Sequence, residues 1–150
     1  MAAIQASNLT RIFAVGEEEV RALDDIDLTL EDGVLAAVVG PSGSGKSTLL
    51  TLLGGLDTPT SGSITVDGGE LSGMSPDELA EYRRTSVGFI FQVFFLLGHL
   101  TALENVEIPM KLAGVPHTER QARAKELIEL VGLQARGGHR PRQLSGGERQ

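Results

Sequence analysis

Cysteine is absent from the 150-residue chain, and basic residues are scarce. Without cysteine there is no disulfide bond, no thiolate metal site and no cysteine nucleophile, and the composition carries no sign of an oxidising compartment. The 13 Lys and Arg residues are outnumbered by 20 Asp and Glu, for a formal net charge of −7. That balance argues against a protein that holds nucleic acid mainly through phosphate attraction, so we expect no nucleic-acid partner.

Long apolar runs are missing as well. No stretch approaches the roughly 18 apolar residues that a membrane-spanning helix needs. The longest apolar cluster, VGFIFQVFFLLGHL, is interrupted by Gly88, Gln92 and Gly98, and we interpret it as a strand followed by a contact loop. The N-terminal residues lack the charged start and apolar core of a signal peptide, so a cytoplasmic location is expected.

Two kinds of strand pattern are present. Residues 20–30, VRALDDIDLTL, alternate apolar and polar side chains, which predicts a half-buried antiparallel strand. It is expected to pair with a strand near residues 4–13, with residues 63–68 as a further member. Residues 34–39, VLAAVV, are continuously apolar, which predicts a strand buried on both faces of a parallel sheet. Residues 86–92, SVGFIFQ, are interpreted in the same way, and the fold class is therefore α/β.

Capping-box patterns predict where four helices begin. In each, a Ser or Thr is followed three residues later by Glu or Gln, which allows two amides at the helix start to be satisfied reciprocally. The four positions are Ser75, Thr101, Thr118 and Ser145. Those at Thr101 and Thr118 are expected to lead into helices near residues 102–112 and 119–131, so helices fill the later part of the chain.

A glycine-rich segment, GPSGSGKST, separates the first buried strand from an apolar helix. It matches the phosphate-binding pattern G-x-x-x-x-G-K-[ST] in the context that this pattern requires. Glycines let consecutive backbone N–H groups point at one anion, and the helix N-terminus adds its positive end. A glycine-rich turn with a surface lysine is the alternative, and the strand and helix on either side favour the binding of a nucleoside triphosphate.

This loop is the predicted ATP site, and it comprises Gly40, Pro41, Ser42, Gly43, Ser44, Gly45, Lys46, Ser47 and Thr48. Lys46 is expected to place a full charge between the β- and γ-phosphates, where it also serves catalysis. The Ser47 hydroxyl is expected to be a ligand of Mg²⁺.

The loop, Gln92 and the segment LSGGERQ at residues 144–150, taken in that order, resemble the nucleotide-binding domain of ATP-binding cassette (ABC) transporters. Further similar segments are GGLDTPTSGSITVDG, RRTSVGFIFQ, LTALENVEIP and RPRQLSGGERQ. They look most like the subgroup that serves lipoprotein-releasing and macrolide-exporting systems and the related cell-division ATPase. The resemblance implies a P-loop NTPase with a RecA-like parallel sheet core, an antiparallel β subdomain and an α-helical subdomain. The β subdomain and phosphate loop would occupy about residues 1–92, and the helical subdomain about 93–150.

The same resemblance assigns roles to residues outside the loop. Phe13 stands where the family places an aromatic side chain that stacks on adenine, with a place in the core as the alternative. Gln92 matches a glutamine that touches Mg²⁺ and the attacking water, which makes it a catalytic and metal-binding candidate. The signature residues are expected to hold the γ-phosphate of ATP bound to another protomer of a homodimer, and they are Ser145, Gly146, Gly147 and Glu148.

Some positions depart from the family pattern. Val34 replaces an acidic residue that the family often has, and QVFFLL is more apolar than the usual QSFNLL. Val93 and Phe94 therefore stand where a helix of the membrane partner should dock, with packing inside the helical subdomain as the alternative.

The resemblance stops at the signature, so the C-terminal part of the domain is expected to be missing. In the family, the Mg²⁺-associated aspartate of the Walker B strand, the catalytic glutamate and the switch histidine all follow this motif. His99, His117 and His139 do not match the switch position. The full-length domain is thus expected to be an ATPase, and residues 1–150 alone are expected to be inactive.

The leading functional hypothesis is an ATP-binding subunit that drives a transmembrane permease in export or lipoprotein release, bound to the cytoplasmic face of the membrane. An ATP-dependent regulator of a membrane partner, of the cell-division type, is the main alternative. DNA-repair ABC ATPases share the loop and signature, but they carry a long coiled coil, and no sustained heptads separate Gln92 from Ser145.

Overall fold

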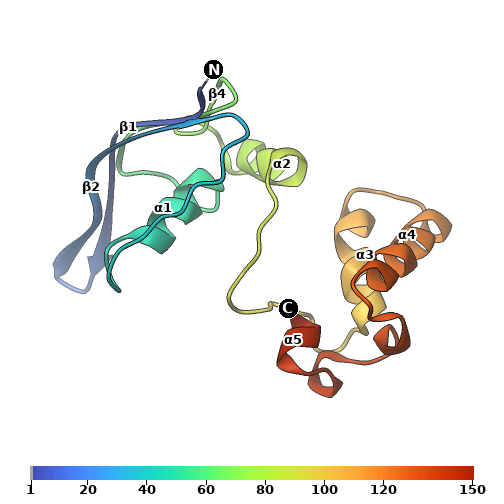
Figure 1. Ribbon diagram of the computed structural model, residues 1–150. Coiled ribbons are helices and arrows are strands. Elements are labelled where there is room, and N and C mark those ends of the chain that lie inside the picture. Colours follow the sequence, from blue (N-terminus) through green and yellow to red (C-terminus); the bar gives the residue numbers. More distant parts are fainter. Residues whose placement is uncertain (1) are drawn as a thin grey trace. The chain divides into compact units, whose positions relative to one another are not determined.

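The computed structural model describes residues 2–150, which form two compact units divided after Phe89 (Figure 1). The second unit is Ile90–Gln150. No helix among the described residues is long and apolar enough to cross a membrane. The subdomain boundary expected near residue 92 stays a prediction.

The first unit is built on an antiparallel sheet with the strand order β2-β1-β3-β4. Strands β1 (Ala2–Val15) and β2 (Glu18–Glu31) form a long hairpin, whose turn contains Gly16 in the left-handed region. Strands β3 (Ser61–Val66) and β4 (Gly69–Glu70) continue the sheet on the other side of β1. The alternating pattern of residues 20–30 is thus confirmed as an antiparallel strand, and so are its two predicted neighbours.

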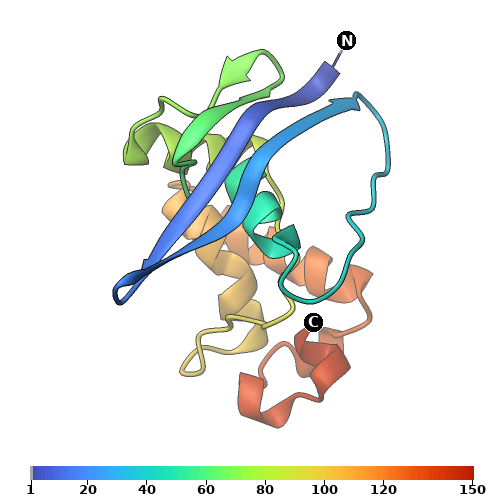
Figure 2. The same ribbon diagram turned by 90° about the vertical axis from the view of Figure 1, so that its left-hand side faces the viewer.

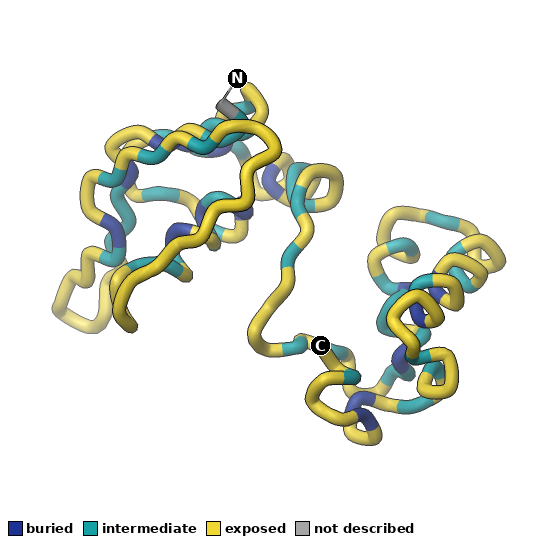
Figure 3. The backbone as a smooth tube through the Cα atoms, in the orientation of Figure 1, coloured by how far each residue is buried: buried dark blue, intermediate teal, exposed yellow. Residues whose placement is uncertain are grey.

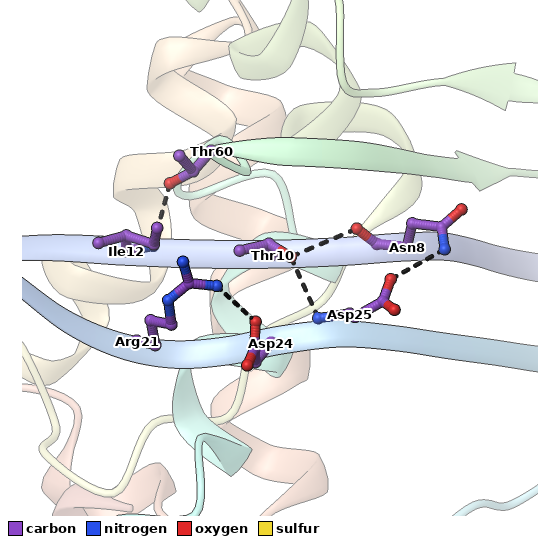
Figure 4. A network of polar contacts seen from close by, with 7 residues as sticks. All are labelled: Asn8, Thr10, Ile12, Arg21, Asp24, Asp25 and Thr60. Atoms are coloured by element: carbon purple, nitrogen blue, oxygen red, sulfur yellow. Dashed lines mark hydrogen bonds and ion pairs between the residues drawn. The ribbon is translucent and has the colours of Figure 1, made fainter.

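The hairpin is irregular where its register shifts, and polar side chains stabilise the irregularity (Figure 4). Asn8 and Asp25 both adopt positive φ there, at 49° and 54°. The side-chain amide of Asn8 donates to Asp25 Oδ1 at 2.8 Å, and the Asp25 backbone N–H donates to Thr10 Oγ1 at 3.1 Å. The second bond satisfies a backbone N–H beside the register shift, and the first joins the side chains of the two strands there.

Two helices cover one side of this sheet, as Figures 1 and 2 show. Helix α1 spans Lys46–Leu53 and helix α2 spans Pro76–Ser86. The Tyr82 hydroxyl of α2 donates to the Leu53 carbonyl oxygen of α1 at 2.9 Å. The buried core between sheet and helices consists of Ala6, Leu9, Leu23, Leu49, Leu52, Ile64, Leu71 and Leu79.

Neither of the two predicted buried parallel strands forms. Residues 34–39 are irregular and exposed, and they lie in the continuously exposed stretch that precedes α1 (Figure 3). Ser86 belongs to α2 and the remaining residues to 92 are irregular, with the side chain of Ile90 90% exposed. A parallel strand needs neighbouring strands and helices on both faces, and neither segment joins the sheet of residues 2–150. The apolar pattern was therefore insufficient to predict strands here.

The second unit is helical. Helices α3 (Ala102–Leu112) and α4 (His117–Leu130) are followed by the 3₁₀ turns η1 (Gln134–Arg136) and η2 (Pro141–Gln143) and by helix α5 (Gly146–Arg149). Its core is formed by Ala102, Ile128 and Leu144, with the half-buried Leu103, Val106 and Leu133 around them.

Three of the four predicted capping boxes are present, at Ser75, Thr101 and Ser145. The prediction for Thr118 was wrong, because α4 begins one residue earlier, at His117, with Pro116 as its N-cap. A residue already inside the helix cannot cap it, and no side chain caps α4 among the described residues. The predicted helix over residues 102–112 is confirmed at both ends.

Candidate nucleotide-binding site

The predicted phosphate-binding loop, residues 40–48, enters α1 through glycines in the left-handed region. Gly43 and Gly45 both have φ of +81°, and Gly45 is the N-cap of α1. A Cβ atom on Gly45 would lie 2.3 Å from the carbonyl oxygen of Ala22 and 2.8 Å from Leu23 Cδ2. The loop thus approaches the backbone of β2 so closely that only glycine fits at position 45.

The start of α1 offers several free amides. The first helical bond runs from the Leu49 N–H to the Gly45 carbonyl oxygen, at 2.9 Å. The N–H groups of Lys46, Ser47 and Thr48 have no acceptor within the helix, as geometry dictates, and they find none elsewhere in residues 2–150. They lie at the positive end of the helix dipole, which suits them to an anion.

Lys46 folds back over its own loop. Its ammonium group donates to the Pro41 carbonyl oxygen at 2.6 Å and to Ser44 Oγ at 3.3 Å. Lys46 is half-buried, so its cation is held against the loop that precedes α1. A polyphosphate at this place would offer the ammonium stronger, charged acceptors than a carbonyl and a hydroxyl.

The residues present fit ATP and Mg²⁺. The first turn of α1 supplies amide donors and a lysine for phosphate oxygens, and the exposed Ser47 supplies a hydroxyl oxygen. Mg²⁺ is commonly held by one or two protein ligands together with substrate phosphates and water. Within residues 2–150, no group of three or more His, Asp or Glu side chains is placed to hold a metal ion without such help.

Phe13 lies on β1 opposite Val20 and is 36% exposed. It is outside the buried cluster of the first unit, so the structure does not place it in the core, and its contact with adenine stays a prediction. The guanidinium carbon of Arg11 lies 4.6 Å from the centre of its ring. Sequence reasoning missed Arg11, although its position two residues before Phe13 on a strand was a usable signal.

The segment around Gln92 is irregular and apolar. Gln92 is exposed, as are its neighbours Ile90 and Val93, at 90% and 62%. The rings of Phe91 and Phe95 meet edge to face with centroids 5.1 Å apart. Phe94 is half-buried and lies under the guanidinium of Arg149, at 5.4 Å. Phe94 thus packs against Arg149 within its own unit, as the alternative expected, whereas Val93 is exposed; a docking role for Val93 stays a prediction.

The signature forms a short, tightly capped helix. Ser145 Oγ accepts the Glu148 N–H at 3.3 Å, and Glu148 Oε2 accepts the Ser145 N–H at 2.7 Å. Glu148 Oε1 also accepts from Arg136 Nε at 3.0 Å. Hydrogen bonds from the backbone and side chain of Ser145, and then from Arg136, hold the pKa of Glu148 below its ordinary value. Both carboxylate oxygens of Glu148 thus accept hydrogen bonds from the same unit, one from the helix cap and one from Arg136.

The glycines of the signature leave open space. A Cβ atom on Gly146 or Gly147 would meet nothing within 4 Å, and both residues are exposed. Of the predicted site residues, Phe13 and the loop 40–48 belong to the first unit, whereas Gln92 and the signature belong to the second.

The family model described as ABC transporter matches residues 23–150. An uncharacterized ABC transporter ATP-binding protein of Thermotoga maritima is 53% identical over 140 residues, which cover 93% of this chain and 60% of that protein. The macrolide export ATP-binding/permease protein MacB of Rhodopseudomonas palustris is 54% identical over 147 residues, which cover 98% of this chain and 22% of that one.

Solved structures of ATP-binding cassettes are similar to this chain as well. The dimeric, post-hydrolysis structure of the ATP-binding cassette MJ0796 with ADP and Pi superimposes with a TM-score of 0.88 at 39% identity. The match covers 97% of this chain and 65% of that one. The chain thus spans less than two thirds of the length of these relatives.

Proposed function

This chain belongs to the ABC transporter ATP-binding family, and from that premise we propose that it binds ATP with Mg²⁺ and serves a transmembrane exporter. The main support for the proposal is the start of α1, where three backbone amides have no acceptor and the Lys46 ammonium lies against the same loop. Two glycines with positive φ precede this turn. The similarity to MacB proteins supports export over regulation of the cell-division type. Lipoprotein release is a narrower form of this proposal. It is supported by the resemblance of several sequence segments to the subgroup that includes lipoprotein-releasing systems.

In the proposed mechanism, the loop 40–48 would wrap the phosphates, and the free amides of α1 would donate to them. Lys46 would exchange the Pro41 carbonyl for the β- and γ-phosphates, and the exposed hydroxyl of Ser47 would be the protein ligand that holds Mg²⁺. The metal ion neutralises phosphate charge when bound. Phe13 supports the adenine, and Gln92 orients the attacking water.

Hydrolysis is proposed for the full-length domain only. In the family, the Mg²⁺-associated aspartate and the catalytic glutamate follow the signature, so we propose that residues 1–150 hold ATP without cleaving it. ABC family membership supports ATPase activity for the protein in which all these groups are present.

The composite site is proposed to form between two protomers. Ser145, Gly146, Gly147 and Glu148 of one protomer would face the γ-phosphate held by the loop 40–48 of the other. Support comes from the dimeric state of both MJ0796 structures, with TM-scores of 0.88 and 0.87. The exposed glycines at 146 and 147 would let a phosphate approach the backbone.

The proposed membrane partner would dock at the apolar segment that follows Phe89. Ile90, Val93 and Phe95 are 90%, 62% and 70% exposed, and an apolar surface of this kind commonly marks an interaction site. Such docking would hold the chain at the cytoplasmic face of the membrane.

The proposal is tested by replacing the loop lysine. Lys46→Ala should abolish most ATP binding, because it removes a charge-assisted contact and no core volume. Lys125→Ala is the matched control, since Lys125 is an exposed lysine on α4. A titration with fluorescent ATP measures the affinity, and an unchanged affinity in Lys46→Ala would refute the proposal.

A further inference from the structure

Arg11 lies over the ring of Phe13, at a place where the sheet is only two strands wide. Strand β1 pairs with β3 only as far as Thr10, opposite Ser61, so Phe13 sits on a two-stranded stretch with β2 alone. Two-stranded hairpins are marginally stable in water. A side chain there needs support from outside the ladder if it is to keep one orientation.

The guanidinium of Arg11 supplies that support. Its carbon lies 4.6 Å from the centre of the Phe13 ring, within the range of a cation–π contact. Phe13 as a residue nevertheless remains 36% exposed. A cation therefore supports the Phe13 ring, and part of the residue remains accessible to a planar ligand.

Asp57 holds Arg11 in place. Its two carboxylate oxygens lie 2.9 and 2.7 Å from Nη2 of Arg11. The side chains are only 21% and 28% exposed, so solvent screens this pair less than an ordinary surface pair. Asp57 Oδ1 also accepts the N–H of Thr58 at 2.8 Å, which fixes the carboxylate.

The loop that carries Asp57 is tied to β1 on both sides of Arg11. The Thr60 N–H donates to the Thr10 carbonyl oxygen at 2.9 Å. The Ile12 N–H donates to Thr60 Oγ1 at 3.0 Å (Figure 4). The same loop leads directly from α1, whose N-terminus carries the phosphate-binding loop. The contacts thus connect the support of Phe13 with the phosphate-binding helix.

The position of Arg11 leaves one of its own hydrogen-bond donors unsatisfied. Its Nε is buried and has no hydrogen-bond partner in the part of the chain that the structure describes. An unpaired buried donor destabilises a fold and calls for an explanation. Support of Phe13 provides one.

We propose that Arg11 is a positioning residue that holds the Phe13 ring ready to stack on the nucleotide base, and that Asp57 locks Arg11 in that position. The proposal rests on the proposed role of Phe13 in ATP binding. A ring already held in its binding orientation loses less conformational freedom when the base arrives, which improves affinity. The effect is specific to the base, because Arg11 is assigned no contact with phosphate.

The test compares two ligands, MgATP and magnesium tripolyphosphate, of which only the first has a base. Their affinities are measured by calorimetry on the full chain for wild type, Arg11→Gln, Asp57→Asn, Phe13→Ala and the double variant Arg11→Gln/Phe13→Ala. Arg21→Gln is the matched control, because Arg21 forms a 2.7 Å ion pair with Asp24 on the same hairpin.

Arg11→Gln should weaken ATP binding by about threefold to tenfold and leave tripolyphosphate binding unchanged. Asp57→Asn should act in the same direction and less strongly, and Arg21→Gln should change neither affinity. Added to Phe13→Ala, the Arg11→Gln change should have no further effect on ATP, since the two side chains act as one unit.

Equal weakening of both ligands by Arg11→Gln, or thermal destabilisation with an unchanged ratio of affinities, would overturn the proposal in favour of a structural role. Arg11→Lys, which keeps the charge and loses the planar fork, replaces Arg11→Gln if that variant fails to fold. If Phe13→Ala leaves the ratio of affinities unchanged, the proposed role of Phe13 fails, and that of Arg11 fails with it. If only Phe13→Ala changes the ratio, Phe13 keeps its role and Arg11 loses its own.

Discussion

Two glycines of the phosphate-binding loop share one backbone conformation and differ in their surroundings, which allows a matched pair of substitutions. Gly43 and Gly45 both have φ of +81°. A Cβ atom on Gly43 would meet nothing within 4 Å, whereas one on Gly45 would lie 2.3 Å from the carbonyl oxygen of Ala22. Gly43→Ala therefore tests conformational strain alone, and Gly45→Ala tests strain together with the contact to β2.

The expected magnitudes follow from these two terms. A side chain in the left-handed region costs roughly 1–2 kcal/mol, which is the whole expected effect of Gly43→Ala. Pushing the loop away from β2 adds an overpacking cost of about 1–3 kcal/mol for Gly45→Ala, since the obstructing atoms are backbone. The total of roughly 2–5 kcal/mol is a large part of the stability of a typical domain, which is about 5–15 kcal/mol.

Urea unfolding followed by circular dichroism measures the difference between the two variants. Gly138→Ala is the baseline, because Gly138 has an ordinary φ and open space around it. We expect Gly138→Ala to be near neutral and Gly45→Ala to be clearly less stable than Gly43→Ala. If Gly45→Ala and Gly43→Ala prove equally stable, the close approach of the loop to β2 is not maintained in solution and the reasoning is wrong.

Three further predictions concern catalysis, assembly and pH. Purified residues 1–150 should release no phosphate from ATP, and steady release that Lys46→Ala abolishes would contradict this. In the full-length protein, a mixture of Lys46→Ala and Ser145→Arg chains should dimerise with ATP better than either variant alone, because only the mixed dimer has one intact composite site; sedimentation shows whether it forms. The lowered pKa of Glu148 should stabilise the helical unit above the ordinary carboxylate pKa of 4.5 and lose that contribution as the pH falls through the lowered value. Acid unfolding of Glu148→Gln should lack this part of the pH dependence.

Local patterns predicted much of the fold. Alternation along residues 20–30 identified an antiparallel strand, and the reciprocal Ser/Thr and Glu pairs located the starts of α2, α3 and α5. The glycine-rich loop 40–48 was also recognisable as a candidate phosphate site, because its glycines and lysine lie within a few residues of one another; its binding of phosphate stays a prediction. These features depend on neighbours close in the chain, so the amino-acid order was sufficient to determine them.

Other features depend on partners distant in the chain, and only the tertiary structure decided them. The apolar run of residues 34–39 was compatible with a buried strand, but it pairs with no strand of the described sheet and is exposed. Phe13 was compatible with the core or the surface, and the fold leaves it exposed beside Arg11. Arg11 meets Asp57 across 46 positions of sequence, at the point where the loop after α1 returns to β1. Burial and ion pairing follow from which surfaces meet, and the path of the whole backbone determines that.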